Sequence, residues 1–152
     1  MHATIISVGT WKDKALKEVF AGYAARCTPK LELLELELPA RDMHADIKAK
    51  EAALIQKHLP AGATLIACDE RGKQFASRDF ANALQAQMDS RGPRLTFVIG
   101  GADGLDSSII KQAHFTLGLG LATWPHLLAR VMLAEQIYRA QTILAGHPYH
   151  RD

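Results

Sequence analysis

The chain has 152 residues, of which 48% are hydrophobic and 22% are charged, as in ordinary globular proteins. No segment approaches the roughly eighteen apolar residues of a membrane span, and the first residues lack a signal-peptide pattern, so we expect a cytoplasmic protein with no membrane partner. A net charge of +2 is compatible with nucleic-acid binding but does not indicate it. If the protein binds RNA, we expect the contact to be limited to a small part of its surface.

The first part of the chain predicts two strands separated by a helix. Ala3–Gly9 is a short β-branched run that ends in glycine, which is typical of a buried strand. Lys12–Arg26 carries apolar residues at helical spacing. Leu31–Pro39 alternates, which predicts a strand with one solvated face that carries Glu35 and Glu37.

The middle of the chain continues the alternation. A helix is expected over 45–58 and a buried strand over Ala63–Asp69, after which the letters "ERGK" predict a turn. Ser77 is expected to cap a helix that runs to about Met88. Arg94–Gly101 gives the clearest strand pattern in the chain.

The last third predicts a short helix over 107–113, a strand followed by a glycine-rich loop within 115–124, and a long helix over Pro125–Ala145. Strands that alternate with helices indicate an α/β fold with a mostly parallel sheet sandwiched by helices. The length fits one domain over residues 1–152.

A glycine-rich loop, "IGGADGLDSS" at 99–108, follows the strand over Arg94–Gly101. Its glycines let backbone N–H groups approach a ligand, and ligands of parallel α/β folds bind beyond the carboxyl ends of strands. The alternative is a tight turn in which Asp106 or Ser107 caps the next helix. The loop lacks the Lys-Ser/Thr pair of a phosphate loop and does not lie in the first strand–helix unit, which argues against kinases, GTPases and NAD enzymes.

A second loop, "LGLGLATWPH" at 117–126, is apolar apart from the hydroxyl of Thr123. It could form a wall for a flat apolar group such as a purine, with backbone groups reading its edge. Pro125 stands at the favoured first position of the next helix. The alternative is a plain connection from strand to helix.

The last helix has two apolar stripes, so it is either central in its own domain or shared with a partner subunit. Glu135 and Arg139 stand four residues apart and can pair, either as a structural pair or to orient a tail or substrate group. Beyond the helix, His147 and His150 have no companion at a known metal-binding spacing, so we expect no metal.

The tail nevertheless has an unusual composition for a chain end. Pro148 stiffens it, Tyr149 offers a ring that could stack on a base, and Arg151 could clamp a phosphate. A frayed end is the ordinary alternative.

Taken together, "FVIGGADG", "TWPHLLARVMLAEQIYRA" and the terminal "HPYHR" closely resemble the RlmH family of SPOUT-class methyltransferases, and the resemblance runs from Ser7 to Arg151. That family methylates N3 of a pseudouridine in helix 69 of 23S rRNA on assembled ribosomes. The resemblance implies a homodimer, a parallel sheet between helices with a C-terminal trefoil knot, and S-adenosylmethionine bound in the knot.

The resemblance also assigns cofactor-binding positions in three loops. Leucine is frequent in the family where Cys68 stands here, and serine is frequent near the position of Gly120. The positions that the resemblance assigns to the cofactor are Cys68, Gly100, Gly101, Gly120, Leu121, Ala122, Thr123, Trp124 and Pro125.

Methyl transfer from a sulfonium requires an aligned nucleophile that is deprotonated at the right moment. We expect Arg151 beside the developing negative charge, Tyr149 orienting the base, and His126 or His150 accepting the proton. On the substrate side we expect Glu135, Arg139 and His147.

Three other functions are compatible with parts of the pattern. The chain could be a non-catalytic α/β module that binds ribosomes, which would have no affinity for S-adenosylmethionine. It could be a knotted methyltransferase with a tRNA substrate, although such enzymes often carry a more basic extension. A nucleotide hydrolase is disfavoured because the sequence offers no base-plus-metal constellation.

Overall fold

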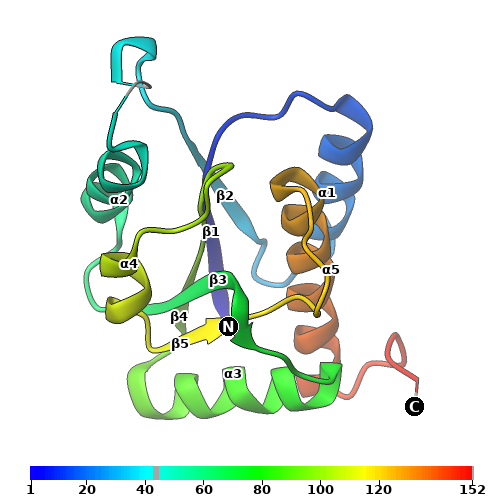
Figure 1. The fold of residues 1–152 in the computed structure, drawn as a ribbon. Helices are drawn as coiled ribbons and strands as arrows, with labels where there is room; N and C mark the ends of the chain where they lie inside the picture. The colour runs from blue at the N-terminus through cyan, green and yellow to red at the C-terminus, as the bar shows by residue number, and fades with distance from the viewer. Residues whose placement is uncertain (43–44, 152) are drawn as a thin grey trace.

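A five-stranded parallel sheet forms the centre of the protein in the computed structural model, which describes residues 1–42 and 45–151 (Figure 1). The strand order is β2-β1-β4-β3-β5, and each neighbouring pair is parallel. The strands are β1 (His2–Val8), β2 (Glu32–Leu36), β3 (Thr64–Lys73), β4 (Arg94–Ile99) and β5 (Phe115–Leu117). The helices are α1 (Lys14–Arg26), α2 (Ile47–His58), α3 (Ser77–Arg91), α4 (Ser107–Gln112) and α5 (His126–Leu144), with a short 3₁₀ turn, η1 (Ala40–Asp42).

The helices cover both faces of the sheet. Side chains of α1, α3 and α5, such as Phe20, Phe80 and Leu133, pack in one core on one face. Those of α2 and α4, such as Ile55 and Ile109, pack in a second core on the other face. The predicted α/β sandwich is therefore confirmed, and the described part of its sheet is parallel throughout. No helix within the described ranges is long and apolar enough to cross a membrane.

The predicted turn at "ERGK" is wrong, because β3 continues to Lys73. The extension pairs again with β5 after an irregularity, so that Lys73 stands opposite Leu117. Two glycines make this close contact possible. A Cβ atom on Gly72 would lie 2.4 Å from the carbonyl carbon of Leu117, and one on Gly118 would lie 2.7 Å from the Gly72 oxygen. The backbones of the two segments therefore lie in direct contact at these glycines.

The expected cap at Ser77 is also wrong. The capping position of α3 is Ala76, and Ser77 is the first helical residue. The Ser77 hydroxyl instead donates a hydrogen bond to Oε1 of Gln136, at 3.0 Å, because α5 packs alongside the start of α3.

The predicted solvated face of β2 is partly covered by α5. Arg130 on that helix is fully buried, and its Nη1 donates to Oε1 of Glu35 over 3.1 Å. The Nη2 group of Arg130 donates to the carbonyl oxygens of Val8 and Gly9, at 2.9 and 2.8 Å. One guanidinium group therefore joins α5 to the carboxyl ends of β1 and β2. The strand ends at Leu36, earlier than expected, and Glu37 lies beyond it.

Candidate functional site

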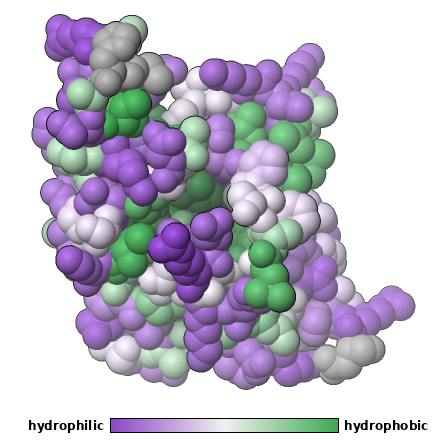
Figure 2. Space-filling model, in the orientation of Figure 1, coloured by the Kyte–Doolittle hydropathy of each residue, from purple (hydrophilic) through white to green (hydrophobic). Residues whose placement is uncertain are grey.

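A cavity of about 1060 Å³ lies at the carboxyl ends of β3 and β4. In the space-filling view, apolar side chains are visible among hydrophilic ones near the centre of this face (Figure 2). The cavity is framed by the end of β3, by the loop between β4 and α4, and by the loop between β5 and α5. The lining residues that bear on its chemistry are Lys48, Cys68, Asp69, Glu70, Gly100, Gly101, Asp103, Gly120, Ala122, Thr123, Trp124, Pro125 and His126.

The loop after β4 is wound so tightly that a side chain would not fit at Gly100 or Gly101. A Cβ atom on Gly100 would lie 2.6 Å from the carbonyl carbon of Gly104, and Gly104 itself has a φ of +79°. An isolated bridge joins Gly101 to Gly104. Asp106 then caps α4, as one of the sequence alternatives expected, by accepting from the backbone N–H and the hydroxyl of Ser108. These hydrogen bonds hold the pKa of the Asp106 carboxyl below its usual range.

Glu51 of α2 contacts this loop at Gly101, and the sequence pattern did not indicate such a role for it. Its side chain is 8% exposed, and its Oε2 accepts a hydrogen bond from the Gly101 N–H at 3.2 Å. A Cβ atom on Gly101 would lie 2.5 Å from Oε1 of Glu51. Burial raises the pKa of Glu51, the Gly101 hydrogen bond lowers it, and the nearby Asp103 raises it. No sequence signal identified Glu51, because a glutamate in a helix is ordinarily exposed.

The loop before α5 forms the opposite wall. The Trp124 Nε1 group donates to the Leu119 carbonyl at 3.2 Å, and the Thr123 hydroxyl donates to Oε2 of Glu70 at 3.3 Å. Leu121, predicted to bind a cofactor, is 95% exposed and does not line the cavity. The other predicted cofactor-binding residues do line it.

Cys68 and His126 are two titratable side chains of the cavity. Burial raises the pKa of the Cys68 thiol to about 12, so the side chain stays neutral. Burial also lowers the pKa of His126, and the positive charges of Arg130 and Lys12 lower it further. A neutral imidazole at the mouth of the cavity can accept a proton.

The predicted residues of the tail gather further along α5, around Glu135 and Arg139. Glu135 pairs with Arg139 as expected, and its Oε1 also accepts a hydrogen bond from the Tyr149 hydroxyl at 3.0 Å. Nη1 of Arg139 lies 3.2 Å from Nδ1 of His150. His147 folds back within the tail, where its Nδ1 accepts from the Tyr149 N–H at 3.2 Å.

The tail does not enter the cavity of its own chain. Ala129 is the last residue of α5 that lines the cavity. Glu135, where the tail docks, stands about 9 Å further along the helix at 1.5 Å per residue. Figure 1 shows the segment after α5, drawn in red, beside the C-terminal end of that helix. Arg151 is exposed there. The structure thus brings Tyr149 and His150 to Glu135 and Arg139, and places His126 apart from all four.

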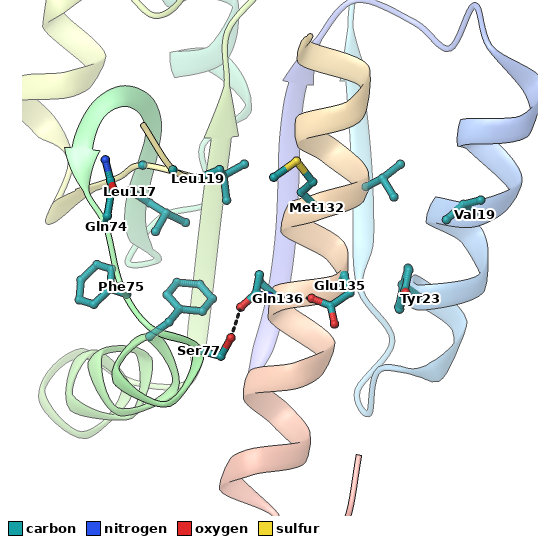
Figure 3. Close-up of a pocket in the computed structure, with 14 residues that line it drawn as sticks. Val19, Tyr23, Gln74, Phe75, Ser77, Leu117, Leu119, Met132, Glu135 and Gln136 are labelled. Carbon is teal, nitrogen blue, oxygen red and sulfur yellow. Dashed lines mark hydrogen bonds between the residues drawn. The ribbon is translucent and has the colours of Figure 1, made fainter. Parts of the chain in front are cut away.

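A second, apolar cavity of about 500 Å³ is lined by residues of α1, α5, the start of α3 and the segment after β3 (Figure 3). Met132 and Val131 line it from α5, and Phe75 lines it from the segment before α3. Val19 of α1 lies at its edge and is 48% exposed. A single copy of the chain therefore leaves apolar surface uncovered beside α5.

The comparisons with known proteins agree with this geometry. A family model described as "Predicted SPOUT methyltransferase" matches residues 1–150. A protein of Caulobacter vibrioides named "Ribosomal RNA large subunit methyltransferase H" is 46% identical over 155 residues, covering 100% of this chain and 99% of its own. A protein of Rhodospirillum centenum with the same name is 44% identical over 151 residues, covering 99% of both chains.

Solved structures share the fold at lower sequence identity. A probable methyltransferase from Bordetella pertussis superposes with a TM-score of 0.59 at 16% identity, covering 92% of this chain and 94% of that one. The SpoU methyltransferase AviRb from Streptomyces viridochromogenes, in complex with the cofactor AdoMet, gives a TM-score of 0.51 at 13% identity, covering 96% of this chain and 59% of that one.

Proposed function

Because the chain belongs to the SPOUT methyltransferase family, we propose that it methylates large-subunit ribosomal RNA with S-adenosylmethionine as the methyl donor. The observation that carries this proposal is the cavity at the carboxyl ends of β3 and β4, framed by the two glycine-bearing loops. Full-length relatives named as ribosomal RNA large subunit methyltransferases support the substrate class. The family also implies a trefoil knot in the C-terminal part of the fold.

The cavity residues fit S-adenosylmethionine. This cofactor supplies a methyl group on a positively charged sulfur. The carboxylates of Asp69, Glu70 and Asp103 line the cavity and suit a cationic ligand. Gly100, Gly101 and Gly104 add no side chains to the cavity wall, and apolar residues such as Leu119 and Leu105 suit the purine. Cys68 has a neutral thiol and would contact the cofactor through its backbone groups.

The nucleobase that we propose as the acceptor is a pseudouridine, methylated at N3, in helix 69 of 23S rRNA. Its N3–H must lose a proton before or during transfer. Neutral His126 at the mouth of the cavity, or His150 of the tail, would accept it. The guanidinium group of Arg151 would stabilise the negative charge that develops on the base. Glu135, Arg139 and His147 would hold the tail in place beside the bound nucleobase.

The active form that we propose is a homodimer. None of the tail residues that the structure describes lines the cavity of its own chain, because the tail docks at Glu135, about 9 Å along α5 from Ala129. The uncovered apolar surface at Val19 and Met132, beside the same helix, supports packing against a second copy. In such a dimer, the tail of one subunit would reach the cavity of the other.

The substrate that we propose is the assembled ribosomal particle in the cytoplasm. A net charge of +2 gives little general attraction to RNA. An assembled ribosomal surface can supply recognition through shape and through its own proteins, which free RNA lacks.

Gly100→Ala should damage the cavity. The new Cβ would meet backbone atoms of Gly104 and Leu105 at 2.6 to 2.8 Å, so the loop must move. We expect cofactor affinity to fall at least tenfold, and the free energy of unfolding to fall by about 1–3 kcal/mol. Calorimetry with S-adenosylmethionine and urea unfolding measure the two effects.

Gly22→Ala is the matched control for this variant. Gly22 lies inside α1 with no atom within 4 Å of an added Cβ. We expect unchanged cofactor affinity and a gain of about 0.5–1 kcal/mol in stability. If Gly100→Ala bound S-adenosylmethionine as tightly as wild type, the loop after β4 would not belong to the cofactor site.

The decisive test of the function combines three measurements on the wild-type protein. Calorimetry should show binding of S-adenosylmethionine, and transfer of a labelled methyl group should be detected on assembled ribosomes and mapped to the base. Sedimentation of the same sample should give the mass of two chains. Absence of cofactor binding would favour the non-catalytic ribosome-binding module. Label on tRNA, with none on ribosomes, would favour the tRNA enzyme.

A further inference from the structure

Two guanidinium groups lie close to the ring of Tyr149. The guanidinium carbon of Arg26 lies 5.0 Å from the ring centroid, and that of Arg139 lies 4.8 Å from it. The ring of Tyr138 meets Tyr149 edge-on, with centroids 4.7 Å apart. Cations over an aromatic ring are attracted by its electron-rich faces. The tail is therefore docked by its tyrosine, and does not fray.

Both guanidinium groups are themselves fixed. Arg26 is in the last turn of α1, where its Nη2 donates to the Tyr138 hydroxyl at 3.0 Å and its guanidinium carbon lies 4.2 Å from the Tyr138 ring centroid. Arg139 is held by its pair with Glu135. Two helices, α1 and α5, thus set the place of the tail.

The hydroxyl of Tyr149 adds a directional contact. It donates to Oε1 of Glu135 at 3.0 Å. Burial, followed by the hydrogen bond to Glu135, raises the pKa of Tyr149 to about 12, so the hydroxyl remains a donor at physiological pH. The ring and the hydroxyl are both engaged by residues of the same chain.

We propose that Arg26 is a positioning residue, which clamps Tyr149 against α5 and so directs His150 and Arg151 toward the substrate. The proposal rests on the proposed methyltransferase function. It changes the role expected for Tyr149, because Arg26, Arg139 and Glu135 of the same chain already engage its ring and its hydroxyl. Arg26, which the sequence pattern did not indicate as functional, would then help to place the catalytic residues of the tail.

Arg26→Gln tests the clamp, with methyl transfer measured on ribosomes at saturating S-adenosylmethionine. Loss of the cation over the rings of Tyr23, Tyr138 and Tyr149 should lower turnover about fivefold. Cofactor affinity should be unchanged, because Arg26 does not line the cavity. Arg26→Lys keeps the charge and loses the planar group, so its turnover should lie between those of Arg26→Gln and wild type. Arg91→Gln, at an exposed arginine in the last turn of α3, is the matched control and should match wild type.

A second readout follows the tail directly. Hydrogen exchange of the backbone amides of Tyr149–Arg151 should be faster in Arg26→Gln than in wild type and Arg91→Gln. Tyr149→Phe, which keeps the ring and loses the hydroxyl, should retain more turnover than Tyr149→Ala.

Two results would overturn the clamp. The first is wild-type turnover together with wild-type exchange in Arg26→Gln. The second is lower turnover in Tyr149→Ala with unchanged exchange in the tail, which would mean that Tyr149 contacts the nucleobase. If the wild-type protein methylates nothing, the proposed function fails, but the exchange measurement still decides whether Arg26 holds the tail.

Discussion

Arg151→Ala should lower the turnover number for ribosome methylation about a hundredfold, the effect typical of removing one group that stabilises a developing anion. The guanidinium of Arg151 is exposed in the single chain, so nothing in the fold depends on it. We therefore expect unchanged stability and unchanged affinity for S-adenosylmethionine. Single-turnover rates at saturating cofactor, together with calorimetry, measure these quantities.

Two further variants define the role of Arg151. Arg151→Lys keeps the positive charge but lacks the planar fork, and should recover part of the lost rate. A chain that ends at Gly146 should behave like Arg151→Ala, with cofactor binding intact. An unchanged rate in Arg151→Ala removes this residue from the mechanism, and lost cofactor binding in the shortened chain would place the tail in the cofactor site.

Arg130→Ala should be the most destabilising single change considered, lowering the free energy of unfolding by about 3 kcal/mol. The side chain is fully buried, so its removal leaves a cavity, and the carbonyl oxygens of Val8 and Gly9 lose their donor. The carboxylate of Glu35 also loses its partner, although this group is 27% exposed and can be partly solvated. Urea unfolding measures the loss.

The matched control for Arg130→Ala is Arg91→Ala, which removes an exposed arginine from α3 and should change stability by less than about 0.5 kcal/mol. The double variant Glu35→Leu with Arg130→Met should recover much of the loss, because an apolar pair of similar volume needs no buried charge. A stability of Arg130→Ala within about 0.5 kcal/mol of wild type would show that the buried arginine contributes no net stability.

The sequence predicted features that depend on local pattern. The alternation of strands and helices, the cap at Asp106 and the pair of Glu135 with Arg139 are all confirmed. Each depends on residues close together in the chain, whose spacing and side-chain chemistry are visible in the letters alone.

Features that depend on tertiary contacts were not predicted. Glu35 was expected in water because β2 alternates, but buried Arg130 approaches it from 95 residues further along the chain. The support that Glu51 gives to Gly101 likewise joins two distant elements. The extension of β3 to Lys73 depends on pairing with β5, which the letters "ERGK" do not reveal. Tertiary packing overrides local preference at each of these places.

The separation of tail and cavity along α5 has a genetic consequence. If catalysis joins the tail of one subunit to the cavity of its neighbour, two impaired variants can complement each other. Co-expression of Gly100→Ala, which keeps its tail, with Arg151→Ala, which keeps its cavity, would produce hybrids with one complete site each. Random pairing of equal amounts should restore about a quarter of wild-type activity. A tail that served its own chain would restore none.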